Sequence, residues 1–192
     1  MLFLSVAAAF AGQSMRVAVC NRGQVPGTVV ERAKAETAYV FQAMDVEIRW
    51  MECGAEIGAQ DSRQRPDFIV RMQMGGHITT AGPASLDAMG RAFMNDTGYG
   101  YMVDTYYTAI RDLARLFPYA GDDQLLGYVM AHELGHLLIS AGHRPNGIMR
   151  ASWNKAEMEA LNQRHLKFND WERKAILRAL EARKLQQGVP VE

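Results

Sequence analysis

The sequence predicts an α/β (α+β) protein with a mixed, twisted sheet, one buried central helix and a small helical C-terminal part. An apolar run at 16–20 and alternating apolar residues at 46–50 flank a segment of helical periodicity, which predicts a strand–helix–strand unit. The segment 122–138 has apolar residues on nearly every side, as expected of a helix inside the core. Cap-plus-acid spacing at 154–157 and 169–172 predicts two closing helices.

The composition is that of an ordinary globular protein. The 192 residues suffice for one domain with a substantial core, and 48% hydrophobic with 22% charged residues is a usual balance. Lys plus Arg and Asp plus Glu both number 21, so net charge favours neither nucleic acid nor an anionic membrane. We expect a monomer with no nucleic-acid partner and no stable membrane insertion after processing.

The N-terminus carries a short apolar run. Residues 1–11 are too few to span a bilayer, and Ala9-Phe10-Ala11 fits an A-x-A cleavage site. No Lys or Arg precedes the run, so an apolar N-terminal strand is the alternative. We expect export to the periplasm or the medium, with 1–14 as the signal peptide remnant.

The two cysteines leave two interpretations open. Cys20 and Cys53 each follow a predicted strand, so neighbouring strands would let them form a disulfide in an oxidising compartment. Two small buried hydrophobic residues are the alternative. Their spacing is not the C-x-x-C of a metal site.

The first half of the chain predicts parallel strands. Thr28 and Glu31 have capping-box spacing, and apolar residues at helical spacing then continue to Met44. A helix between two strands requires a parallel pair with a right-handed crossover.

Further strands are predicted at 68–72, 88–93 and 99–103. The second of these is weak, and Gly90 within it suggests an edge strand or a bulge. We expect the next helix to be capped by Asp104 or Thr105 and to end by Pro118.

The central helix carries His132-Glu133-Leu134-Gly135-His136. Residues four apart share a helix face, so both imidazoles could bind one zinc ion, with Glu133 acting on water at the metal. A surface helix with two chance histidines is the alternative. Three imidazoles would leave zinc one open position, which suits peptide hydrolysis with Glu133 as general base.

The third zinc ligand has several candidates. His143, just past Gly142, is the first, and Glu157 or Glu159 on the next predicted helix could replace it. Capping is the simpler explanation for Glu157. His77, in a glycine-rich loop, could line the cleft but is more simply a solvated side chain.

These residues resemble the metzincin clan of zinc endopeptidases. The resemblance rests on H-E-L-G-H, a third His after a glycine and the turn Gly147-Ile148-Met149. The stretch 132–153 also resembles a group of small exported bacterial zinc peptidases. The resemblance implies a zincin fold with zinc bound by His132, His136 and His143. It also implies Glu133 as general base and Met149 as a packing platform beneath the metal.

The same resemblance implies that the edge strand near 88–94 pairs with an extended substrate. The chain departs from the clan pattern at two places. Ile139 stands where the clan has glycine, and the third His comes one residue later. The helix should therefore run on until Gly142 permits the chain to reverse. No Tyr follows Met149 where some members have one, and Trp153 is the nearest aromatic residue.

The sequence thus predicts a zinc-dependent endopeptidase acting on a peptide or protein. A catalytically inactive zinc-binding protein and a zinc hydrolase of non-peptide substrates are the alternatives. Within one domain, we expect 15–143 to form a sheet-bearing part with the active-site helix. Residues 144–192 would form the methionine turn and the helical C-terminal part.

Overall fold

The structure is a computed structural model. It describes residues 12–54, 65–76, 84–85, 89–96, 98–139 and 142–186. The apolar run 1–11 and His77 lie outside the described residues, so the predictions made for them stay predictions.

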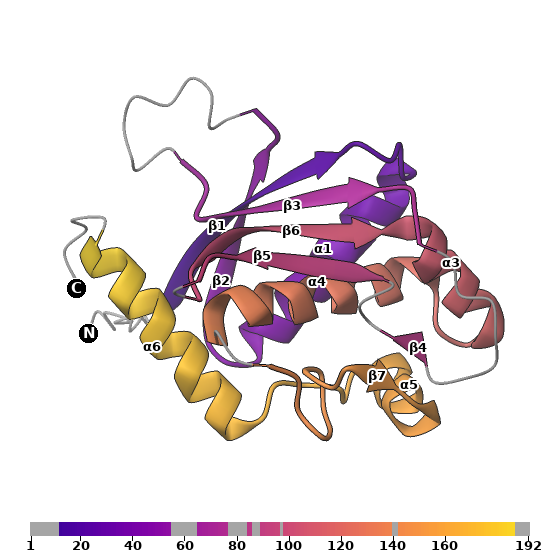
Figure 1. Ribbon diagram of the computed structural model, residues 1–192. Coiled ribbons are helices and arrows are strands. Elements are labelled where there is room, and N and C mark those ends of the chain that lie inside the picture. The colour runs from indigo at the N-terminus through magenta and orange to yellow at the C-terminus, as the bar shows by residue number, and fades with distance from the viewer. Residues whose placement is uncertain are drawn as a thin grey trace, which may run out of the picture.

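A five-stranded mixed sheet forms one layer of the molecule (Figure 1). Its strands, in the order β2-β1-β3-β6-β5, are β2 (Val46–Glu52), β1 (Gln13–Asn21), β3 (Phe68–Gln73), β6 (Gly100–Tyr106) and β5 (Gly90–Met94). Neighbours pair in parallel except β5 and β6, which are antiparallel with a register shift at Phe93/Met94. The predicted parallel pair around the first helix and the edge strand with a bulge are both confirmed.

Helices α1 (Gly27–Gln42) and α4 (Asp122–Ile139) cover one face of this sheet. The other helices are α3 (Tyr107–Leu116), α5 (Lys155–Asn162) and α6 (Asp170–Gln186). Figure 1 shows α1 and α4 lying along the sheet, with the C-terminal segment below α4. A second, two-stranded sheet, which the sequence did not predict, pairs β4 (Ala84–Ser85) with β7 (Ser152–Trp153).

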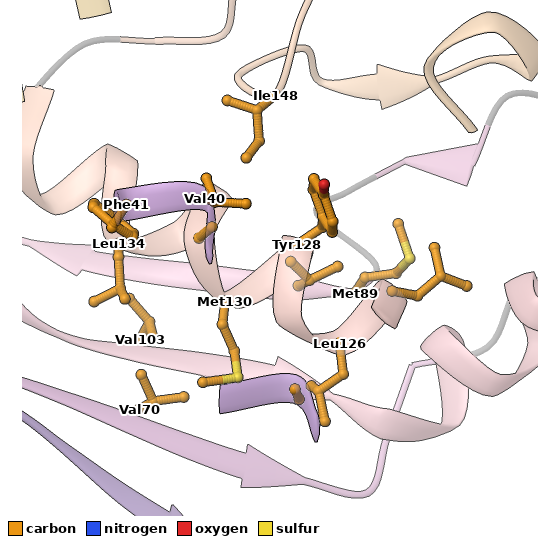
Figure 2. Close-up of a cluster of buried hydrophobic side chains, with 14 of the residues drawn as sticks. Val40, Phe41, Val70, Met89, Val103, Leu126, Tyr128, Met130, Leu134 and Ile148 are labelled. Carbon is orange, nitrogen blue, oxygen red and sulfur yellow. The ribbon is translucent and has the colours of Figure 1, made fainter. Parts of the chain in front are cut away.

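The centre of the core is α4. Every residue from Leu125 to Leu138 is buried, as the all-round apolar pattern predicted. Met130 and Leu134 point from α4 toward Val70 and Val103 of the sheet (Figure 2). Because the histidine motif lies within this buried segment, its backbone is held on all sides by packing.

Two predicted helix caps are wrong. Helix α1 begins at Gly27 after Pro26, and no side chain caps it, so Thr28 lies inside the first turn. Proline presets a backbone angle compatible with helix entry, which makes a side-chain cap dispensable. Helix α3 begins at Tyr107, because Asp104 and Thr105 still belong to β6.

The side chain of Asp104 has another function. Its carboxylate accepts hydrogen bonds from Arg71 Nε at 2.6 Å and from Gln73 Nε2 at 2.6 Å on the adjacent strand. Strand pairing and these bonds together extend β6 to Tyr106, so Asp104 does not cap α3. The predicted end before Pro118 is correct, since α3 stops at Leu116.

Both C-terminal caps are confirmed. Asn154 and Glu157 form a reciprocal capping box at the start of α5. At α6, the Asn169 amide donates to Glu172 Oε2 at 2.8 Å, and the Glu172 amide donates to Asn169 Oδ1 at 3.0 Å. Such boxes satisfy amides that a helix start otherwise leaves without partners.

A disulfide joins Cys20 at the end of β1 to Cys53 just after β2, which decides between the two interpretations of the cysteines. Within the described part of the chain, no helix combines the length and the apolar character needed to cross a membrane.

Candidate metal centre

The motif on α4 brings two imidazoles together. His132 is fully buried and His136 is 9% exposed, and their Nε2 atoms lie 3.0 Å apart. Two nitrogens bound to one zinc ion at about 2.1 Å lie ~3.4 Å apart, so the observed separation is close to that of a shared ligand pair. The four-residue spacing on a rigid, buried helix produces this arrangement.

A backbone carbonyl orients His132. Its Nδ1 lies 2.7 Å from the carbonyl oxygen of Ile148, and since a carbonyl only accepts, Nδ1 must carry the proton and donate. Nε2 therefore keeps its lone pair on the side facing His136. In metal sites this second hydrogen bond fixes the tautomer and the ring orientation of the ligand.

Burial keeps His132 neutral. Desolvation first, and then the nearby His136 and His143, lower the pKa of His132 to about 3, against the opposing effect of the Ile148 carbonyl. Metal binding requires a neutral imidazole. His132 would therefore have no proton to lose on binding a metal at neutral pH.

His143 completes a group of three imidazoles. It lies beyond α4, is exposed, and offers a ring nitrogen that lies within 4.8 Å of those of His132 and His136. Its ring is 4.8 Å from that of His136 and 5.4 Å from that of His132, measured between centroids. Three nitrogens converging on one point form a donor set suited to zinc, with room for a further ligand.

The segment between α4 and His143 is described only in part. Ile139 is the last residue of α4, and the two residues after it lie outside the described part of the chain. Gly142 does not adopt a left-handed backbone, and nothing lies within 4 Å of the position where its Cβ would be. That Gly142 permits the chain to reverse stays a prediction, because the two residues before it lie outside the described part of the chain.

The turn after His143 is closed by its own hydrogen bonds. The Arg144 amide donates to the Met149 carbonyl at 2.8 Å, and the Arg150 amide donates to the Gly147 carbonyl at 3.2 Å. Gly147 has φ 79°, a left-handed conformation that favours glycine. This turn presents the carbonyl of Ile148 to His132.

Met149 packs against α4 at Gly135. It is 1% exposed, and a Cβ added to Gly135 would lie 2.7 Å from its Sδ atom. Gly135, one residue before His136, therefore allows the turn to approach the helix closely. That Met149 lies beneath a bound metal, as the resemblance implied, stays a prediction.

The alternative glutamates are engaged elsewhere. Glu157 receives hydrogen bonds from Arg150 Nη1 at 2.8 Å and from the Asn154 amide at 3.0 Å, and it belongs to the α5 capping box. Glu159 lies 3.7 Å from Lys155 on the exposed side of α5. Neither glutamate belongs to the three-histidine group. The simpler explanation of Glu157, that it caps α5, is therefore confirmed.

Glu133 lies beside the backbone of the edge strand. It is 3% exposed, and a Cβ added to Gly90 would lie 2.5 Å from its Oε1 atom. Glycine at this position of β5 leaves space for the carboxylate. From the sequence, Gly90 indicated only an edge or a bulge, although glycine in a strand also indicates close approach of another group.

Tyr107 and His165 do not belong to the three-histidine group. Tyr107 donates to Asp122 at 2.5 Å and so connects α3 with the start of α4; burial and this carboxylate raise the pKa of Tyr107 to about 12. His165 lies in the link between α5 and α6, where its amide bonds to the Ala160 carbonyl. Neither residue has a role in the proposed chemistry.

Comparison with known proteins gives a fold-level likeness. No protein-family model matches the sequence, and no curated protein matches it. Among solved structures, the chain is similar to archaemetzincin from Methanopyrus kandleri, with TM-score 0.53 and 14% identity over 89% of this chain and 98% of that one. It is also similar to metalloproteinase-II from Bacteroides fragilis, with TM-score 0.51 and 10% identity over 88% of this chain and 53% of that one.

These likenesses, with the three clustered histidines, confirm the metzincin-like fold and the mixed α/β class that the sequence predicted. At such low identity they support the fold alone. The roles of the individual residues have to be argued from the geometry of the site.

Proposed function

We propose that the protein is a zinc-dependent endopeptidase. The observation that carries this proposal is the convergence of three imidazole nitrogens within 4.8 Å, beside a buried carboxylate on the same helix. His132, His136 and His143 would hold the metal, and the neutral state and fixed tautomer of His132 suit that role.

Glu133 is the residue that favours hydrolysis over a structural zinc site. A zinc ion held by the histidines supplies a Lewis acid that polarises the scissile carbonyl and makes water acidic. Glu133 takes the proton from the attacking water and returns it to the leaving amine. A structural metal site has its coordination closed by protein and does not need such a base.

The edge strand provides a place for an extended substrate. Strand β5 is last in the order of the sheet, so the described sheet has no neighbour for it on its outer side. A peptide chain can add to such an edge through backbone hydrogen bonds, largely independently of its sequence. Because Gly90 of β5 lies against Glu133, a peptide on this edge would run close to the base.

The test is to purify the protein, measure zinc per chain, and compare cleavage of a peptide library by native protein and by Glu133→Gln. We expect one zinc in both proteins, and cleavage lower in the variant by 10²–10⁴-fold, the usual contribution of a general base. Equal cleavage by the two proteins would refute the proposal. Bound zinc without cleavage in either would favour an inactive zinc-binding protein or a hydrolase of other substrates.

We further propose that the protein acts outside the cytoplasm, in the periplasm or the medium. The Cys20–Cys53 disulfide supports this, since such bonds persist in oxidising compartments. Alkylation of free thiols in fractionated cells tests it. Export predicts that neither cysteine is alkylated before reduction, whereas alkylation of both in a cytoplasmic fraction would contradict it.

A further inference from the structure

One carbonyl oxygen near the metal centre receives hydrogen bonds from two side chains. The oxygen of Ile148 accepts from His132 Nδ1 at 2.7 Å and from Trp153 Nε1 at 3.3 Å. A carbonyl has two lone pairs, so it can accept both bonds at once. Its direction is therefore fixed from two sides, and one of these is a proposed zinc ligand.

Trp153 is itself held firmly. Its side chain is 1% exposed, and its ring lies edge-on to that of His132, with centroids 6.2 Å apart. Its backbone belongs to β7 and pairs with Ala84 of β4. A buried indole N–H needs an acceptor, and here the acceptor is the carbonyl that orients His132.

We propose that Trp153 is a positioning residue for His132, acting through the carbonyl oxygen of Ile148. Without the indole N–H, this carbonyl can rotate away from its two-donor position. The hydrogen bond that keeps the proton on His132 Nδ1 then weakens, and the tautomer with the proton on Nε2 becomes more populated. That tautomer cannot offer Nε2 to a metal.

The test compares Trp153→Phe, which keeps an aromatic ring but removes the N–H, with the matched change Trp50→Phe on β2. Nitrogen-15 NMR of labelled histidine in metal-free protein reports the His132 tautomer. Competition with a chelator reports the affinity for zinc ion alone.

We expect the Nε2-protonated form of His132 to increase only in Trp153→Phe. Zinc affinity should fall about 3–10-fold, less than the 10–100-fold typical when a direct outer partner is lost. A lower melting temperature with unchanged tautomer and zinc affinity would overturn the proposal, because Trp153 would then serve packing alone. Weaker zinc binding with an unchanged tautomer would also overturn it.

If Trp153→Phe does not fold, the indole N–H of Trp153 can be replaced without loss of side-chain volume. Benzothienylalanine, which has sulfur in place of the indole N–H, can be incorporated for tryptophan in a Trp50→Phe, Trp171→Phe background. The same two outcomes are expected and the same results would overturn the proposal.

This inference rests on the proposed function only for the role of His132 as a ligand, and neither readout uses a peptide. A protein that binds zinc but cleaves nothing still tests it in full. If the native protein binds no zinc, the proposed function fails, while the tautomer in the metal-free protein still decides the role of Trp153.

Discussion

His132 and Glu133 are adjacent in the sequence but are held by two different parts of the molecule. His132 is oriented by the segment that precedes β7, through the carbonyl of Ile148. Glu133 lies against β5, where Gly90 leaves room for its carboxylate. Figure 1 shows these two parts on different sides of α4, with β5 above and the segment before β7 below.

The two parts act by different physical means. The segment before β7 provides a backbone hydrogen-bond acceptor, the Ile148 carbonyl, so no side chain is needed for this purpose. The edge strand provides space, which requires the absence of a side chain. We therefore expect that the proposed metal binding and the proposed proton transfer can be disrupted separately, although the two residues share one helical turn.

The largest effect on zinc affinity is expected from loss of His132, the proposed ligand that the segment before β7 orients. His132→Ala should reduce zinc affinity by more than the 10–100-fold that loss of an outer partner costs, because a ligand itself is removed. His143→Ala should reduce it less, since His143 is exposed and water can occupy its place. Chelator competition measures both variants. Unchanged zinc affinity in His143→Ala would show that another residue is the third ligand.

A smaller but still large effect is expected from the edge strand. Gly90→Ala places a Cβ against Glu133, so the carboxylate must move, and a displacement of about 1 Å can cost on the order of 10²-fold in rate. Zinc content should stay at one per chain. Gly27→Ala, where nothing lies within 4 Å of the added Cβ, is the matched control. Equal loss of zinc and of cleavage in Gly90→Ala would show that the two parts are not separable.

The pH dependence of the metal-free protein tests the burial of His132. The pKa of His132 is lowered to about 3 in the folded protein, from 6.5 in a free side chain, so the unfolded chain binds more protons between these values. Its contribution to stability is therefore complete above pH 6.5 and is lost as the pH falls toward 3. Thermal unfolding should show a steeper loss in this window for native protein than for His132→Gln. Parallel curves would contradict the buried, neutral state.

The smallest effect is expected from Glu157→Gln. This change weakens the ion pair with Arg150, which is 34% exposed, and the α5 cap, so stability should fall by about 1 kcal/mol. Zinc affinity should be the same as in native protein. A fall comparable to that of His143→Ala would identify Glu157 as a ligand after all.

The sequence predicted the elements whose pattern is local. Alternation, helical periodicity and the asparagine caps identified the sheet strands, the buried α4 and the two closing helices. The histidine spacing placed two imidazoles together because four residues make about one helical turn. The caps at Thr28 and Asp104 failed because proline and strand pairing, respectively, provided a competing local solution.

Contacts between distant segments could not be predicted. The approach of Gly90 to Glu133 and the pairing of β4 with β7 depend on the tertiary arrangement of segments far apart in the sequence. The two bonds to the Ile148 carbonyl involve a backbone atom, which carries no residue-specific pattern. In the sequence, Trp153 was only the aromatic residue nearest to Met149. Its partner, the Ile148 carbonyl, is brought to it by the folded turn.

The central claim is that Glu133 delivers water to a peptide bond at a three-histidine zinc site. The most direct measurement is mass spectrometry of fragments produced by the zinc-loaded protein in ¹⁸O-labelled water. The account predicts one ¹⁸O in each newly formed carboxyl terminus, and fragments reduced by 10²–10⁴-fold with Glu133→Gln at equal zinc content. Labelled fragments formed equally by both proteins would contradict it.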